Sequence, residues 1–88
     1  MHEAGLTADL LEHVIEEADR AGATRVTAVH VAIGPGFIVS PAAFRSWWAI
    51  ITEGTRAEGS SIRIRRRRAE GSGCRLIALD VDDAAAVP

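Results

Sequence analysis

The sequence lacks several residue types and has very little of another. It contains no lysine, asparagine, glutamine or tyrosine, and all ten of its basic residues are arginine. Its one cysteine, Cys74, cannot form a disulfide within the chain or a zinc site made of several thiolates. No apolar run approaches the roughly 18 residues that a membrane span needs. These absences exclude a disulfide-stapled domain and a membrane-spanning one, so stability must come from packing.

Length and composition indicate one small domain. With 88 residues, of which 48% are hydrophobic, the chain has room for one core and enough apolar side chains to fill it. The first residues, Met1 to Ala4, lack the basic region and apolar stretch of a secretory signal. We therefore expect a cytoplasmic domain over residues 1–83, followed by a loose C-terminal tail over residues 84–88.

Charge is distributed unevenly, although the formal net charge is only −2. Residues 1–20 contain six acidic residues and one arginine, whereas residues 56–75 contain seven arginines and two acidic residues. The two ends of the fold are therefore expected to differ in sign.

Apolar periodicity predicts a first helix and a first strand. The helix begins near Leu6, and its apolar positions are Leu10, Leu11, Val14, Ile15, Ala18 and Ala21. Gly22 follows them, where a left-handed C-cap is favoured. The strand covers residues 25–33, and its alternation places on one face the residues Thr27, Val29, Val31 and Ile33.

A second helix is predicted after the glycine-rich turn at residues 34–36. Ser40 is a good N-cap and Pro41 suits the first turn, while Gly54 closes the helix. The side chains expected to be buried are Phe44, Ile51 and either Trp47 or Trp48. The two tryptophans are adjacent, so one of them must face outwards.

Two further strands complete the predicted fold. Ile62 and Ile64 mark the second strand, and the third runs from Arg75 to Val81 with Ile77, Leu79 and Val81 on one face. A turn at residues 70–73 predicts that the two strands form a hairpin, and one register places Arg63 opposite Asp80. The element order α-β-α-β-β indicates an α+β two-layer sandwich, with two helices on one face of a three-stranded mixed sheet.

The order of short motifs along almost the whole chain resembles one known family. The motifs are Met1-His2-Glu3, the strand ending at Ile33-Gly34, the helix opening at Pro41, Thr52-Glu53-Gly54-Thr55, Ala57-Glu58-Gly59 and the closing Arg75-Leu76-Ile77-Ala78-Leu79-Asp80-Val81. This pattern is similar to that of the HypA/HybF family of hydrogenase-maturation nickel chaperones. The resemblance implies a nickel-binding accessory protein for [NiFe]-hydrogenase maturation, with a maturation GTPase and the hydrogenase large subunit as partners.

The sequence departs from the family pattern in three places. The family carries a zinc-binding insert with two Cys-x-x-Cys pairs, where this chain has only Ala69 and Glu70 between Arg68 and Gly71. The family's Gly-Glu after the first strand is Gly34-Pro35 here, and Ser40 replaces an acid that some members carry. We therefore expect Ni(II) without zinc. The alternative is a zinc-less, metal-free adaptor that docks on the maturation partners.

The first three residues supply a chemical reason to expect a metal. The α-amino nitrogen of Met1, the deprotonated amide of His2 and the His2 Nδ1 can close fused chelate rings around one ion. Such a planar nitrogen array suits Ni(II) or Cu(II), whereas zinc prefers a tetrahedron. The fourth donor is left open between the amide or carboxylate of Glu3, water and a partner group. Without a metal, His2 is an ordinary solvated residue.

The remaining candidate residues favour structural roles. His13 is expected at the polar border of the first helix, His30 on the sheet face opposite Val29 and Val31, and Cys74 as a small apolar filler. Since no nucleophile is placed beside a general base by local structure, we do not expect an enzyme.

The charged runs are expected at the surface. The arginine run 65–68 favours a protein partner over nucleic acid, because strand alternation puts only Arg63, Arg65 and Arg67 on one stripe and no aromatic is interleaved. The acids expected to neutralise part of it are Asp80, Asp82 and Asp83. The acids near the end of the first helix, Glu16, Glu17 and Asp19, form either a solvated face or a docking surface for a basic partner. Association of two chains is left open.

Overall fold

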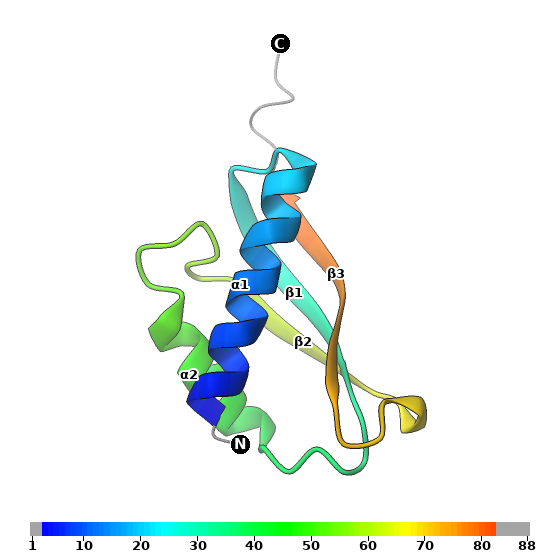
Figure 1. The fold of residues 1–88 in the computed structure, drawn as a ribbon. Helices are drawn as coiled ribbons and strands as arrows, with labels where there is room; N and C mark the ends of the chain where they lie inside the picture. Colours follow the sequence, from blue (N-terminus) through cyan, green and yellow to red (C-terminus); the bar gives the residue numbers. More distant parts are fainter. Residues whose placement is uncertain (1–2, 83–88) are drawn as a thin grey trace.

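The computed structural model describes residues 3–82, which form two layers (Figure 1). The elements are α1 Glu3–Ala21, β1 Arg25–Ile33, α2 Pro41–Ile51, β2 Ser61–Arg66, the 3₁₀ turn η1 Arg68–Glu70 and β3 Cys74–Asp82. The predicted order α-β-α-β-β and the α+β class are confirmed. The expected tail over residues 84–88 lies outside the described residues.

Helix α1 packs through a narrow stripe. Its buried side chains are Thr7, Leu10, Val14 and Ala18, which recur every three or four residues and so face one side. The helix ends in a Schellman motif, in which the amide of Ala23 donates to the Ala18 carbonyl and that of Gly22 to the Asp19 carbonyl. Gly22 has φ of 68°, a conformation that glycine adopts without strain. The predicted C-cap is confirmed.

Strand β1 lies at the centre of the sheet. It pairs in parallel with β2 and antiparallel with β3, so the mixed sheet is confirmed. The predicted hairpin between the second and third strands is wrong, because these strands lie on opposite sides of β1. Six of the nine residues of β1 are apolar, and all six are buried: Val26, Ala28, Val29, Val31, Ala32 and Ile33. A strand that is buried on both faces is best accommodated between two neighbours.

The link between β2 and β3 crosses the end of β1. The amide of Arg67 donates to the Ile33 carbonyl, and that of Gly36 donates to the Gly71 carbonyl, both at 2.8 Å. A Cβ atom on Gly34 would lie 2.0 Å from the Gly71 carbonyl oxygen, so this crossing requires glycine at position 34.

The observed strand order also shows that the predicted pairing of Arg63 with Asp80 is wrong. Asp80 lies opposite Ala28, and Arg63 lies opposite His30, so the predicted register that joins Arg63 to Asp80 is wrong. The two side chains come from strands that are not neighbours.

Two register shifts change which side chains face the core. The first falls between Val26 and Ala28, and the second between His30 and Val31. Val26 is therefore fully buried and Thr27 is exposed, so the predicted core position of Thr27 is wrong. A bulge reverses the alternation of a strand beyond it, which periodicity alone does not reveal.

In strand β3, the second shift leaves Ile77 off the predicted face, whereas Val81, which pairs with the buried Val26, is exposed near the end of the strand. Leu76 and Leu79 pack against the core, whereas Ile77 is 38% and Val81 37% exposed. Of the predicted core face, only Leu79 is correct.

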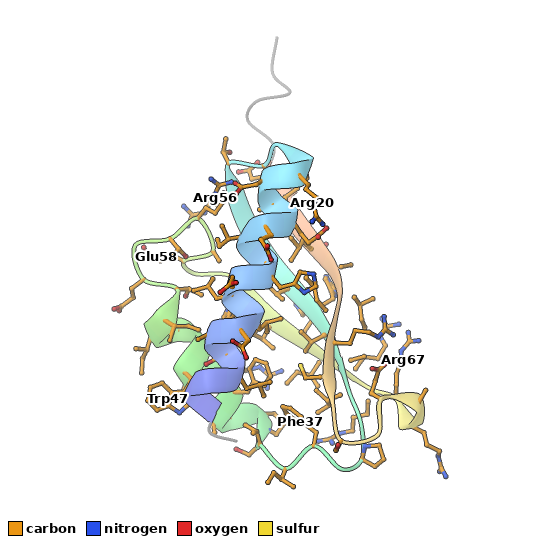
Figure 2. All side chains as sticks on the ribbon, viewed as in Figure 1. Arg20, Phe37, Trp47, Arg56, Glu58 and Arg67 are labelled. Carbon is orange, nitrogen blue, oxygen red and sulfur yellow. The ribbon has the colours of Figure 1, made fainter. Side chains whose placement is uncertain are left out.

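Helix α2 begins and packs as predicted. The Ser40 hydroxyl oxygen accepts the amide of Ala43 at 3.1 Å, and Pro41 occupies the first turn. Phe44 and Trp48 are buried, and Trp47 is 39% exposed, which confirms that one tryptophan faces outwards (Figure 2). The helix ends at Ile51, three residues before the predicted closure at Gly54.

Both helices cover the same face of the sheet. Side chains from α1, α2 and one face of β1 join in a single core cluster, which includes Leu10, Val14, Val29, Phe44 and Trp48. Helix α1 also contacts β3, and α2 contacts β2 (Figure 1). No described helix covers the other face of the sheet.

Candidate functional site

The predicted metal site falls at the beginning of α1. Met1 and His2 lie outside the described residues, and Glu3 is the first residue of the helix. The assignment of a site to Met1, His2 and Glu3 therefore stays a prediction. The structure does describe the first turn of α1, to which these residues are joined.

This first turn of α1 is well packed and lies beside an apolar hollow. Thr7 is fully buried, and Leu6 packs against the core. The hollow has a volume of about 550 Å³ and is lined by Leu6, by residues 36–39 of the loop before α2, and by residues 72–74. Ile38 is 94% exposed at this place. The first described turn of α1 is thus fixed to the body of the domain.

Cys74 lies in this hollow but is a poor ligand. Burial raises the pKa of its thiol to about 11, and the Glu70 carboxylate acts in the same direction. Because the thiolate is the form that binds metals and attacks electrophiles, this shift disfavours both reactions at pH 7. Its packing against the core supports the predicted role as an apolar filler.

The two described histidines lie on separate surfaces. His13 on α1 has its Nε2 3.8 Å from Glu17 Oε2, and His30 on β1 has its Nε2 3.2 Å from Asp80 Oδ2. Each histidine therefore has one carboxylate beside it. Within residues 3–82, no three His, Cys, Asp or Glu side chains gather closely enough to hold a metal ion.

The arginine run is less neutralised than the sequence predicts. Asp80 reaches His30, and Asp83 lies outside the described residues. None of the arginines at positions 63 and 65–68 forms an ion pair with an acid of the described chain. The predicted pairing with Asp80 is wrong because β1 separates β2 from β3.

The acidic end of α1 is partly engaged within the domain. Glu17 pairs with Arg20, and Asp19 Oδ1 lies 2.6 Å from Nη1 of Arg56 in the loop before β2 (Figure 2). Arg56 Nη1 also donates to the Ala23 carbonyl at 3.1 Å. Through these two contacts, Arg56 holds the loop before β2 against the end of α1.

An ion pair that was not predicted from the sequence holds the β2–β3 link in place. Nε and Nη2 of Arg75 donate to Glu70 Oε2 at 3.0 and 2.9 Å. This hydrogen bonding holds the pKa of the Glu70 carboxyl below its usual range and raises that of Arg75. The opposite charges five residues apart were the signal available in the sequence.

Membrane insertion finds no support in the described helices. Neither α1 nor α2 combines the length and the apolar character that a bilayer span requires.

Comparison with known proteins defines the family. A family model described as hydrogenase/urease nickel incorporation, metallochaperone, hypA matches residues 1–78. The match takes in most of the chain, and the chain belongs to the HypA family of nickel metallochaperones.

Among curated proteins, the hydrogenase maturation factor HypA of Klebsiella pneumoniae subsp. pneumoniae is 36% identical over 70 residues, covering 80% of this chain and 61% of that protein. HypA of Methanopyrus kandleri is 34% identical over 68 residues, covering 77% of this chain and 48% of the other. The chain thus spans less than two thirds of the length of these relatives.

The fold comparison agrees with the family. The solution structure of the Ni metallochaperone HypA from Helicobacter pylori superposes with a TM-score of 0.75 at 16% sequence identity, covering 92% of this chain and 97% of that one. A second solution structure of a HypA protein gives the same TM-score and identity, over 94% of this chain and 98% of that one. At 16% sequence identity, this structural similarity establishes the fold alone.

Proposed function

We propose that the chain is a nickel-binding accessory protein in [NiFe]-hydrogenase maturation, which holds Ni(II) at its amino terminus through His2. The observation that carries the proposal is the match of residues 1–78 to a family described by nickel incorporation. The relatives quoted above are hydrogenase maturation factors by name, which supports hydrogenase as the destination of the metal.

The donor chemistry supports this choice of metal. The Met1 amine, the His2 amide and the His2 Nδ1 are three nitrogens that can lie in one plane with the ion. A d⁸ ion such as Ni(II) accepts a planar nitrogen field, whereas Zn(II) is bound better by a tetrahedral set. All three groups must lose a proton, so affinity falls as pH drops below the range in which histidine is neutral.

The start of α1 at Glu3 is compatible with this site. The first four amides of a helix have no intrahelical acceptor, so metal binding at this end breaks no helical hydrogen bond. The fourth planar position lies opposite the His2 amide, and the Glu3 carboxylate, water or a partner group can fill it.

The proposed partners are the maturation GTPase and the hydrogenase large subunit, in the cytoplasm, without catalysis by this chain. We also propose that the role needs no zinc. Support comes from the short link over residues 67–73, which stands where the resemblance expects a zinc-binding insert.

The test is a calorimetric titration with Ni(II) of protein whose Met1 amine is free. We expect one Ni(II) per wild-type chain and a loss of at least tenfold in affinity in His2→Ala, equivalent to about 1.4 kcal/mol. His13→Ala is the matched control, because His13 is an exposed histidine with one carboxylate beside it, and it should bind as wild type. Equal affinity in wild type and His2→Ala would contradict the proposal.

The second candidate is a metal-free adaptor that keeps the family fold to dock on maturation partners. The observations in its favour are the short link over residues 67–73, where the resemblance expects an insert, and Pro35 in place of the family's acid. Wild-type protein that binds no Ni(II) but still binds the maturation partners would support the adaptor.

A further inference from the structure

The uncovered face of the sheet carries a defined set of side chains, here called the open face. The register places Arg63 beside His30 and Arg65 beside Ala32, and it places Ala28 beside Asp80. Residues paired across neighbouring strands point to the same side of a sheet. Ile62 and Ile64, which alternate with the arginines on β2, pack towards the core. Arg63 and Arg65 therefore project away from both helices.

The open face is a shallow trough. Its floor is the middle strand, where Ala28 and Ala32 are 4% and 0% exposed although no described helix covers them. Small side chains can be hidden in this way only when longer neighbours rise on either side. A pocket of about 360 Å³ lies here, and its lining includes His30, Arg63, Arg65 and Asp80.

One wall of the trough is positively charged and unneutralised. Neither Arg63 nor Arg65 forms an ion pair with a described acid, whereas Asp80 on the other side already contacts His30 at 3.2 Å. Arginine offers a planar set of donors that matches a carboxylate, and its charge is weakly hydrated. The wall is thus suited to carboxylates from outside the domain.

The spacing of this wall indicates the shape of the ligand. Arg63 and Arg65 are two residues apart on one strand, and their Cα atoms are separated by roughly 6.6–6.8 Å. An extended peptide presents alternate side chains at the same spacing. We propose that the open face binds an extended segment of a partner protein in which every second residue is acidic, with its carboxylates on Arg63 and Arg65.

A second copy of this chain does not fit the open face. The acidic surface of the molecule is on α1, which lies on the opposite side of the sheet. A two-fold interface cannot contain both surfaces, and a head-to-tail contact between them generates a ring or an open filament instead of a dimer.

Nucleic acid fits less well than an acidic peptide. The aromatic residues Phe37, Phe44, Trp47 and Trp48 lie on α2 or the loop before it, so the open face offers no Phe or Trp ring for base stacking, and its one imidazole, that of His30, is engaged with Asp80. Asp80 also faces the trough, and the chain as a whole has a net charge of −2. This inference does not depend on nickel binding.

The test uses fluorescein-labelled peptides of alternating sequence, (Glu-Ser)5 and (Gln-Ser)5, with the oligonucleotide dT6 as a third probe. Fluorescence anisotropy measures the affinity of each for wild type, for Arg63→Glu/Arg65→Glu and for Arg66→Glu/Arg68→Glu. The last variant is the matched control, because it changes the charge equally outside the open face. We expect wild type to prefer (Glu-Ser)5, with a loss of about tenfold in the open-face variant, ~1.4 kcal/mol, and a much smaller loss in the control.

Amide chemical shifts provide a second readout that needs no variant. In wild-type protein, (Glu-Ser)5 should shift the amides of Ala28, Ala32 and Ala78 more than those of α1. The proposal is overturned by equal losses in the two double variants, by tighter binding of dT6 than of (Glu-Ser)5, or by no binding of (Glu-Ser)5 at low salt. Shifts confined to other surfaces would overturn it as well.

Discussion

At the scale of single residues, the crossing of chain segments at Gly34 places the strictest demand on residue type. A Cβ atom there would lie 2.0 Å from the carbonyl oxygen of Gly71, and the opposing atom is backbone. Backbone cannot rotate away as a flexible side chain can, so the whole β2–β3 link would have to move. Gly5 in α1 is the opposite case, because a Cβ atom there meets nothing within 4 Å.

We predict that alanine at these two glycines changes stability in opposite directions. Gly34→Ala should destabilise the fold by about 2 kcal/mol or more, in the range of severe single substitutions. Gly5→Ala should stabilise it by roughly 0.5–1 kcal/mol, since alanine is the better helix former. Urea unfolding followed by circular dichroism measures both. Similar free energies of unfolding for Gly34→Ala and wild type would contradict the described crossing.

The thiol of Cys74 gives a prediction about pH. Because burial raises its pKa from 9.0 to about 11, the folded protein should react with iodoacetamide at pH 8 about a hundredfold more slowly than the urea-unfolded chain. The unfolded thiol ionises first, so its contribution to stability is present below about pH 9 and is lost as pH rises through about 11. Equal alkylation rates in the folded and unfolded chains would contradict the burial of Cys74.

At the scale of secondary-structure elements, helices were predicted better than strand pairing. The stripe of α1, its glycine cap and the Ser40 N-cap are local features, so periodicity and capping rules identify them. The turn at residues 70–73 was also local evidence, and it suggested a hairpin. What decided the pairing instead was the burial of both faces of β1, which is a property of the assembled sheet.

The two register shifts in the sheet also could not be predicted from local sequence features. Val26 and Thr27 differ in burial because one extra residue shifts the register, and no residue type in β1 signals that shift. Ile77 is exposed for the corresponding reason in β3.

The pair Glu70–Arg75 holds the β2–β3 link and predicts a response to acid. The pKa of Glu70 is lowered from 4.5 mainly by the hydrogen bond from Arg75, so its stabilising effect is present above pH 4.5 and is lost as pH falls through the lower folded value. Glu70→Gln should therefore weaken the fall in melting temperature between neutral pH and pH 3. Glu16→Gln, at an exposed position of α1, is the control and should retain the wild-type slope. The same slope in Glu70→Gln would contradict this role.

At the scale of the whole molecule, the two faces of the sheet differ in what covers them and in which side chains they carry. One face is covered by α1 and α2 (Figure 1) and holds the core. The other face has no described helix over it and carries arginines. The sequence showed that basic residues gather in residues 56–75, but it did not show which of them share a face. That distinction required the position of β1 between β2 and β3.

The candidate metal site follows from chemistry rather than from folding. Its donors belong to the first residues of the chain, so the chelate that an amine, an amide and an imidazole can form is the same with or without a fold. The fold contributes the packed helix to which those residues are joined, and the family contributes nickel as the expected metal.

The most direct measurement is Ni K-edge X-ray absorption on protein with a free Met1 amine and one equivalent of Ni(II). We predict a planar, four-coordinate spectrum with nitrogen donors and imidazole scattering, and the loss of both features in His2→Ala. A six-coordinate, oxygen-rich spectrum, or one that is unchanged by His2→Ala, would contradict this prediction.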